Sequence, residues 1–242
     1  MSQEPAHLTH RVRPAAGDPA GALVLLHGRG ADEHDLFPIL EALDPQRRLT
    51  GVTLRGPLVL PQPDDAGAAR PGEPGRRAGA RPAGAHWYVV RRIGFPDHGT
   101  FHPTYEALTR FVDEKLPELT GAGPDRTVIG GFSQGAVMSY ALGLGEGRPV
   151  PAGILAMSGF IPAVDDWRPA LEERRGLPVA ITHGSHDPVI DVEFGRDARD
   201  RLTAAGLDVT YRESPVGHGV DPRHIDLLRG WLGAALGQGA AR

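Results

Sequence analysis

Short apolar runs alternate with longer stretches of mixed polarity along most of this chain. Apolar runs of four to eight residues are typical of buried strands, and longer stretches with helical spacing of apolar residues are typical of helices. We predict strands at Leu8–Arg13, Ala22–Leu26, Val52–Leu60, Thr127–Gly130, Gly153–Met157, Val179–Thr182 and Val209–Glu213. We predict helices at Tyr105–Leu119, Ser133–Leu144, Phe194–Ala205 and Pro222–Leu236. The alternation predicts an α/β fold with a mostly parallel central sheet flanked by helices.

The stretch at residues 61–84 lacks this pattern. It consists largely of Ala, Gly, Pro and Arg and has no large apolar side chain. It therefore cannot bury enough apolar surface to offset the entropy lost on ordering. We predict a flexible loop there, which is either a tolerated insertion or a rim over the functional site.

Two histidines, His98 and His102, have the spacing of neighbours on one face of a helix. The residues around them that disfavour a helix are Pro96, Gly99 and Pro103. Proline lacks the backbone N–H that an interior helical position needs, and glycine has low helix propensity. We therefore predict a loop that keeps the two histidines apart.

Composition bounds the class of protein. A chain of 242 residues with 40% hydrophobic and 23% charged residues can bury a substantial core, and we expect one domain over residues 1–242. The net charge of −4 gives no reason to expect a nucleic-acid partner, and the lack of cysteine excludes disulfides and thiolate nucleophiles. The N-terminal region has no apolar segment of the secretory type, and no apolar stretch approaches the ~20 residues that span a bilayer. We expect a cytoplasmic protein with no integral membrane segment.

The most informative motif is Gly131-Phe132-Ser133-Gln134-Gly135, which lies between a predicted strand and a predicted helix. A nucleophile elbow has this layout, because the chain reverses so sharply that the nucleophile adopts a strained conformation and its neighbours two residues away must lack bulk. Gly131 and Gly135 meet that demand. The motif predicts that Ser133 is a catalytic nucleophile.

A serine nucleophile needs a base to take its proton and a carboxylate to orient that base. His218 lies between two glycines after the last predicted strand, and Asp187 lies just after the strand Val179–Thr182. The chain order Ser, Asp, His is that of α/β-hydrolases. Asp191 is the competing carboxylate. A metal site formed by His183, His186 and Asp187 is a weaker hypothesis, since His-x-x-His with one aspartate is not specific, and we predict no metal.

The oxyanion of a tetrahedral intermediate needs two backbone N–H donors. In an elbow one donor follows the nucleophile, which here is Gln134. The other comes from a loop after an earlier strand, and His27-Gly28-Arg29-Gly30 has the glycines that allow close approach to a ligand. We predict the N–H of Arg29 as the second donor.

Several motifs together resemble the phospholipase/carboxylesterase family of α/β-hydrolases, which includes acyl-protein thioesterases and small bacterial carboxylesterases. They are Leu26-His27-Gly28-Arg29-Gly30-Ala31-Asp32-Glu33, the elbow, Ser158-Gly159-Phe160-Ile161-Pro162, His183-Gly184-Ser185-His186-Asp187-Pro188-Val189 and Gly217-His218-Gly219. The resemblance implies one α/β-hydrolase domain without a large cap, no cofactor, and the triad and oxyanion donors named above. It also implies Trp87 and Phe160 as walls of the acyl site, with core packing as an equal alternative. The chain departs from the family at Ala136, where glycine is frequent, and at Ile190-Asp191, where Val-Pro is frequent.

The motifs predict a serine esterase. The resemblance implies a carboxylesterase that hydrolyses esters or thioesters with short- to medium-chain acyl groups or of lysophospholipid type. Its partner is a small-molecule substrate, and the sequence leaves a homodimer open. An acyltransferase or peptidase with the same triad is one alternative, because a triad fixes the acyl-enzyme and not what attacks it. A non-catalytic binding module on a hydrolase fold is another.

Overall fold

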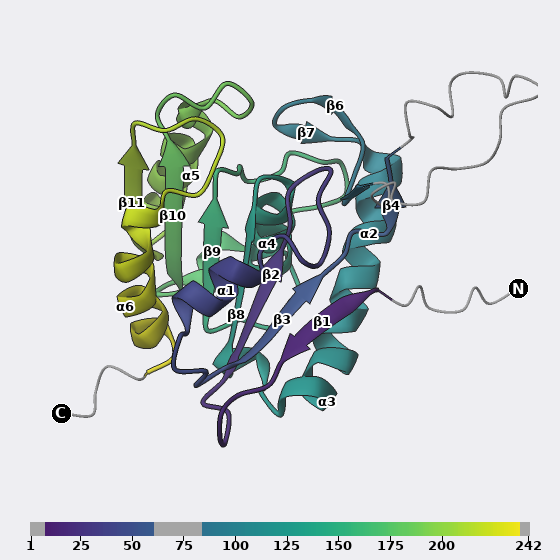
Figure 1. Cartoon of the computed structure of the whole chain (residues 1–242). Coiled ribbons are helices and arrows are strands. Elements are labelled where there is room, and N and C mark those ends of the chain that lie inside the picture. The colour runs from purple at the N-terminus through teal and green to yellow at the C-terminus, as the bar shows by residue number, and fades with distance from the viewer. Residues whose placement is uncertain (1–7, 61–83, 238–242) are drawn as a thin grey trace, which may run out of the picture.

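The computed structural model describes residues 8–60 and 84–237, so the predicted loop at 61–84 lies outside the described residues except for Gly84. Within these ranges a sheet has the order β1-β3-β2-β8-β9-β10-β11 (Figure 1). Its strands are β1 (His10–Arg13), β2 (Ala22–Leu26), β3 (Thr50–Leu54), β8 (Thr127–Phe132), β9 (Gly153–Met157), β10 (Pro178–Gly184) and β11 (Asp208–Ser214). Only the pairing of β1 with β3 is antiparallel in this sheet. The predicted α/β fold with a mostly parallel sheet is confirmed.

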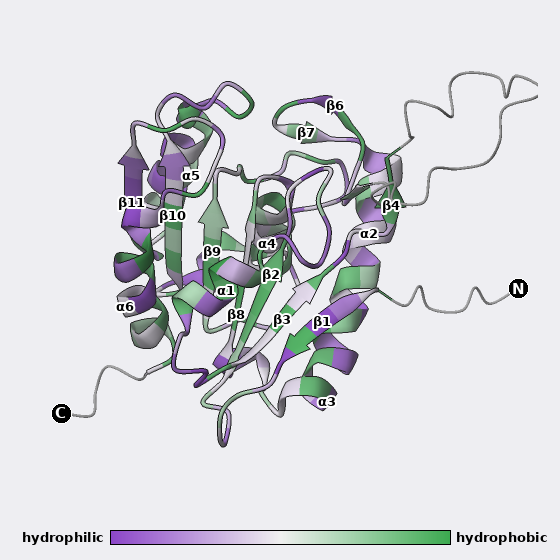
Figure 2. Cartoon of the chain, viewed as in Figure 1, coloured by the Kyte–Doolittle hydropathy of each residue, from purple (hydrophilic) through white to green (hydrophobic). Residues whose placement is uncertain are grey.

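Helices cover both faces of the sheet (Figure 1). They are α1 (Phe37–Leu43), α2 (His98–Arg110), α3 (Leu116–Thr120), α4 (Gln134–Leu144), α5 (Val192–Ala204) and α6 (Ile225–Ala235). Leu23 and Leu25 of β2 pack in one core with α1 and α6, whereas Val24 and Leu26 pack in a second core with α2, α4 and α5. This follows from the alternation of side chains along a strand. Strands β2 and β8 are accordingly apolar and the edge strand β11 is polar (Figure 2).

Helix α4 is buried along its whole length. Its many small and apolar residues allow it to pack against β8 and β9 on one side and α2 on the other, which is the expected position of a helix that is apolar all round. The residue that precedes it, Ser133, is therefore held by the most deeply buried helix of the described chain.

Several predicted boundaries are wrong where elements are short or interrupted. The predicted strand Val52–Leu60 consists of β3 and a separate β4 (Leu58–Val59), which pairs with β5 (Ala85–His86). Gly56 lies between them, where a Cβ would come within 2.6 Å of the carbonyl oxygen of His86. The predicted helix from Tyr105 is α2 followed by a π-helical turn, Phe111–Lys115, and α3. The structure also contains α1 and the hairpin of β6 (Val90–Arg92) and β7 (Phe95–Pro96), which the sequence did not predict.

The prediction of a loop around His98 and His102 is wrong, because both lie in α2 with their ring centroids 4.5 Å apart. Asp97 caps this helix by accepting a hydrogen bond from the Thr100 N–H. Pro103 is inside the helix, where it removes one backbone hydrogen bond. Burial of one face outweighs that loss, and the buried residues are Phe101, Thr104, Ala107 and Leu108.

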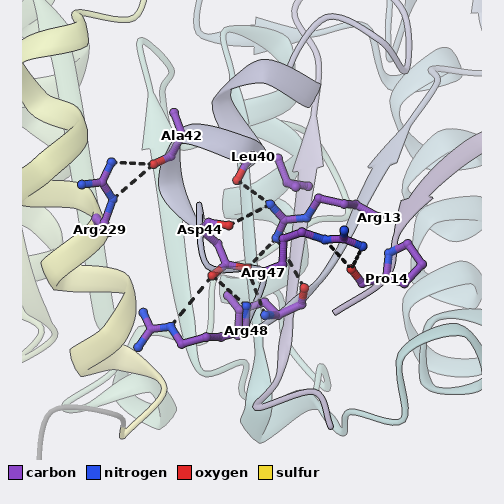
Figure 3. Close-up of polar contacts among 9 residues, drawn as sticks. Arg13, Pro14, Leu40, Ala42, Asp44, Arg47, Arg48 and Arg229 are labelled. Carbon is purple, nitrogen blue, oxygen red and sulfur yellow. Dashed lines mark hydrogen bonds and ion pairs between the residues drawn. The ribbon is translucent and has the colours of Figure 1, made fainter. Parts of the chain in front are cut away.

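A buried ion pair joins β1 to the end of α1 (Figure 3). The Arg13 and Asp44 side chains are 6% and 1% exposed, and Arg13 also donates to the backbone carbonyls of Leu40 and Asp44. The Asp44 carboxylate accepts hydrogen bonds from the Arg48 and Leu49 N–H groups, both of 3.0 Å. These contacts attach the antiparallel edge strand to the helix layer.

Among residues 8–60 and 84–237, every helix is too short or too polar to cross a membrane.

Candidate active site

The turn between β8 and α4 has the geometry of a nucleophile elbow. Ser133 has φ 56° and ψ −118°, a region that a residue with a Cβ occupies only at a cost of about 1–3 kcal/mol. A Cβ on Gly135 would lie 1.9 Å from the Leu26 carbonyl oxygen, and one on Gly131 would lie 2.4 Å from the Gly135 carbonyl carbon. The two glycines are therefore required by the close packing of the turn.

The Ser133 hydroxyl is directed at a histidine rather than at the helix that it precedes. Ser133 is the N-cap residue of α4, yet its side chain makes no capping hydrogen bond. Its Oγ lies 2.9 Å from Nε2 of His218, which the loop after β11 carries back to the sheet. Serine at this position usually caps the helix. In this turn the Ser133 hydroxyl instead contacts the imidazole of His218.

The other nitrogen of the same imidazole contacts Asp187. Nδ1 of His218 lies 2.6 Å from Oδ2 of Asp187, and Oδ1 accepts hydrogen bonds from the N–H groups of Val189 (2.8 Å) and Ile190 (2.9 Å). Burial alone would raise the pKa of Asp187, but the hydrogen bonds from His218, Ile190 and Val189 more than offset it and hold the pKa below its ordinary value. The carboxylate is therefore ionised and fixed in orientation.

The rival carboxylate, Asp191, has a different environment. It is exposed and caps α5, where it accepts a hydrogen bond of 2.9 Å from the Glu193 N–H. It lies at the N-terminus of the helix, whereas Asp187 contacts His218 directly.

His183 and His186 do not converge on Asp187 as metal ligands. His186 is exposed. His183 is buried, and its Nε2 lies 2.9 Å from the Ile190 carbonyl and 3.6 Å from Oδ2 of Asp187. His183 therefore supports the turn whose N–H groups hold Asp187, a role that the sequence did not indicate. In the part of the chain that the structure describes, no three histidine, aspartate or glutamate side chains form a metal-binding group.

The two predicted oxyanion donors come from a loop and from the N-terminus of a helix. Arg29 follows β2, and Gln134 is the first residue of α4. A Cβ on Gly28 would lie 3.0 Å from the Phe132 ring and 3.5 Å from the Ser133 Cβ, so the Arg29 loop passes close to the elbow. The N-terminus of α4 adds the positive end of a helix dipole at this point.

Trp87 and Phe160 are both buried, with 0% and 3% of their surfaces exposed. Phe160 packs against Phe194, and the Trp87 indole N–H donates to the His27 carbonyl at 2.8 Å. Their contacts are those of core residues, and their assignment to substrate binding stays a prediction.

Taken together, a hydroxyl, an imidazole and a carboxylate form a hydrogen-bonded series at the carboxyl ends of β8, β10 and β11. Such a series can move a proton from the hydroxyl to the imidazole while the carboxylate stabilises the resulting cation. The carboxyl ends of the strands are also where open α/β folds bind ligands.

The model of a family described as Phospholipase/Carboxylesterase matches residues 78–234. Acyl-protein thioesterase 1 of Gibberella zeae is 24% identical, with 91% of this chain and 93% of that protein covered. Acyl-protein thioesterase 1 of Neurospora crassa is 27% identical, with coverage of 90% and 88%.

Solved structures with a similar fold include a carboxylesterase from Bacillus cereus, with a TM-score of 0.75, 20% identity and 95% coverage of both chains. The structure of esterase PE8 gives a TM-score of 0.72 with 26% identity, and covers 94% of this chain and 99% of that one. At 20% identity, the likeness to the Bacillus cereus carboxylesterase shows a shared fold and nothing about activity.

Proposed function

The chain belongs to the phospholipase/carboxylesterase family and is a serine hydrolase, and from this premise we propose that it is a carboxylesterase that works through Ser133, His218 and Asp187. The observation that carries the proposal is the pair of hydrogen bonds made by one imidazole, 2.9 Å to the Ser133 hydroxyl and 2.6 Å to the Asp187 carboxylate. A base oriented in this way is what a serine needs to become a nucleophile.

In the proposed reaction, Nε2 of His218 takes the proton of Ser133 as its Oγ attacks the substrate carbonyl carbon. The carbonyl oxygen becomes an oxyanion that accepts hydrogen bonds from the N–H groups of Arg29 and Gln134. The intermediate collapses, and the leaving alcohol or thiol takes the proton from His218. Water then attacks the acyl-enzyme carbonyl carbon with His218 again as the base. The bond from this carbon to Ser133 Oγ breaks, the carboxylic acid leaves, and His218 returns the proton to Ser133.

The substrate class is a carboxylic ester or thioester of short to medium acyl chain, or one of lysophospholipid type. Thioesters as substrates are supported by relatives named acyl-protein thioesterase 1. Esters as substrates are supported by the likeness to esterase PE8. Acyl transfer and peptide hydrolysis proceed through the same acyl-enzyme, and product analysis with added alcohol or with a peptide distinguishes them. The cytoplasmic location and the lack of a metal or cofactor stay predictions, and the oligomeric state is left open.

The test combines labelling with turnover. A fluorophosphonate probe should label the protein at Ser133, as identified by mass spectrometry, and p-nitrophenyl esters of increasing chain length together with matched thioesters should be hydrolysed. The matched control is Ser133→Ala, which should neither label nor turn over. An unlabelled wild-type protein without activity toward any ester or thioester would contradict the proposal.

A further inference from the structure

The side chain of Gln134 is buried and fully engaged, although only its backbone N–H has a place in the proposed reaction. It is 3% exposed. Its Oε1 accepts a hydrogen bond from the Trp87 N–H (3.1 Å), and its Nε2 donates to the Tyr88 carbonyl (2.9 Å). These partners allow one orientation of the amide, because the N–H can only donate and the carbonyl can only accept. The first residue of α4 is thus joined to the segment at residues 85–88.

The same segment is joined to the loop that carries Arg29. The Trp87 indole N–H donates to the His27 carbonyl (2.8 Å). On the other side of Arg29, the Gly30 N–H donates to the Ala85 carbonyl and the Ala85 N–H donates to the Ala31 carbonyl, both at 2.8 Å. The loop is therefore held before and after the predicted donor. The approach is so close that a Cβ on Gly84 would lie 2.1 Å from the Gly30 carbonyl oxygen.

The His27 ring fixes the start of this loop. Its Nε2 accepts a hydrogen bond from the Gly56 N–H (2.9 Å), so Nδ1 carries the proton and donates to the Gly28 carbonyl (2.6 Å). Burial lowers the pKa of His27, which favours the neutral ring that this arrangement requires.

We propose that the segment at residues 85–88 sets the relative position of the two oxyanion donors, with the Gln134 side chain and Trp87 as positioning residues. The inference rests on the proposed function, since it concerns the Arg29 and Gln134 N–H groups. One donor is on the loop after β2 and the other is the first residue of α4, far away in sequence, and a fixed element that binds both keeps them prearranged for the developing charge. Such prearrangement is the basis of oxyanion stabilisation, which falls steeply with small displacements.

Two variants test this role without removing either N–H donor. Gln134→Met preserves side-chain length and removes both amide hydrogen bonds, and Trp87→Phe removes the indole donor. The measurements are kcat and KM for a p-nitrophenyl ester and the inhibition constant of a trifluoromethyl ketone, whose adduct with Ser133 carries an oxyanion. For Gln134→Met we expect kcat to fall about 10- to 100-fold, less than the ~10²- to 10³-fold cost of deleting a donor. The inhibition constant should rise by a similar factor, with KM nearly unchanged. Trp87→Phe should show the same pattern with a smaller effect.

The matched control is Thr120→Val in α3, at the opposite end of the sheet from the elbow (Figure 1). Thr120 is also 3% exposed, and its hydroxyl makes two buried hydrogen bonds, to the Leu116 carbonyl and from the Ala122 N–H. It should lower stability as Gln134→Met does and leave kcat and the inhibition constant unchanged. Equal losses of kcat in both variants would reduce Gln134 to a stability role and overturn the inference.

Failure of this inference is distinguishable from failure of the proposed function. If wild-type protein is labelled at Ser133 and folded Gln134→Met keeps wild-type kcat and inhibition, only the positioning role is wrong. If wild-type protein is neither labelled nor active, the proposed function is wrong. Should Gln134→Met fail to fold, Trp87→Phe provides the same readouts, and an unchanged kcat with an unchanged inhibition constant would overturn the inference.

Discussion

Asp44 and Asp187 are two buried aspartates with similar surroundings and different partners. Their side chains are 1% and 0% exposed, and each accepts two backbone N–H hydrogen bonds. Asp44 is paired with the buried guanidinium of Arg13 (Figure 3), whose charge is permanent. Asp187 is paired with the imidazole of His218, which is 18% exposed and can gain or lose a proton.

The difference lies in how the donors are divided between the oxygens. Each oxygen of Asp44 takes one backbone N–H, and Oδ2 also takes the Arg13 guanidinium. In Asp187 both backbone donors go to Oδ1, and the hydrogen bond at Oδ2 is that to His218, with Nε2 of His183 3.6 Å away. The Asp44 carboxylate, with fixed hydrogen-bond donors on both oxygens, therefore connects parts of the fold. A carboxylate with one oxygen kept for a titratable partner can respond to a proton transfer.

The largest expected effect is that of Ser133→Ala, which removes the hydroxyl at the far side of the imidazole. We expect kcat to fall by roughly 10⁴- to 10⁶-fold, because the covalent route is lost while the proposed oxyanion donors remain. Steady-state ester hydrolysis measures the loss, and circular dichroism checks that the fold is kept. A variant that kept more than a small fraction of wild-type turnover would exclude Ser133 as the nucleophile.

Asp187→Asn should come next, because an amide favours the wrong imidazole tautomer. The equivalent change in the serine-protease template costs about 10⁴-fold in kcat, which we take as an upper guide. The comparison predicts that Asp44→Asn, in a protein that still folds, leaves kcat close to wild type. Similar kcat losses in the two variants would show that the division into a structural and a catalytic aspartate is wrong.

Asp44→Ala should have its effect on stability instead. It leaves the Arg13 guanidinium buried without its anion, and breaking a buried pair in this way costs about 3–5 kcal/mol in the free energy of unfolding. Urea unfolding of the variant against wild type measures this loss. A change below about 1 kcal/mol would mean that water or rearrangement satisfies Arg13.

A smaller effect concerns pH. The folded-state pKa of Asp187 lies below its ordinary value, so its ionised form stabilises the folded protein above the unfolded pKa of about 3.9. This contribution is lost as pH falls through the folded pKa. The difference in unfolding free energy between wild type and Asp187→Asn should therefore shrink as pH is lowered from about 5 to 2. A difference that grew on acidification would contradict the direction of the shift.

The smallest effect is expected for Asp191→Asn. Asparagine caps a helix about as well as aspartate, and the Asp191 side chain accepts its capping bond from Glu193 rather than from His218. We expect kcat to change by less than about threefold and stability by a few tenths of a kcal/mol. If instead Asp191→Asn lost more activity than Asp187→Asn, the triad would be Ser133, Asp191 and His218.

The elbow could be predicted because its constraints are local. A strand, two glycines four residues apart and a small-residue helix follow one another directly in the sequence, and the structure has the strained Ser133 that such a turn requires. The strands β2, β9 and β10 were predicted for a similar reason, since their apolar residues are contiguous and buried on both faces of the sheet.

Elements that depend on distant partners were not predicted. The first half of helix α2, before the predicted start at Tyr105, forms despite Pro103 because its buried face packs against the core, which no local pattern reveals. The Arg13–Asp44 pair joins residues 31 positions apart, and the Gln134 side chain reaches partners 46 and 47 positions away. Polar contacts of this kind have no periodicity, so the sequence, which left an acyl-site wall and core packing as equal alternatives for Trp87, did not indicate its hydrogen bond to the His27 carbonyl.

The backbone hydrogen bond between residues 60 and 84 bears on where this chain can be lengthened. The Leu60 N–H donates to the Gly84 carbonyl at 2.9 Å, and β4 pairs with β5 immediately beside it. The chain therefore leaves and re-enters the described residues at a single point, and the entropic cost of bringing these two ends together grows only slowly with the number of residues between them. We expect an affinity tag or a reporter domain inserted between these positions to leave the hydrogen bonds of Ala85 to Gly30 and Ala31 in place.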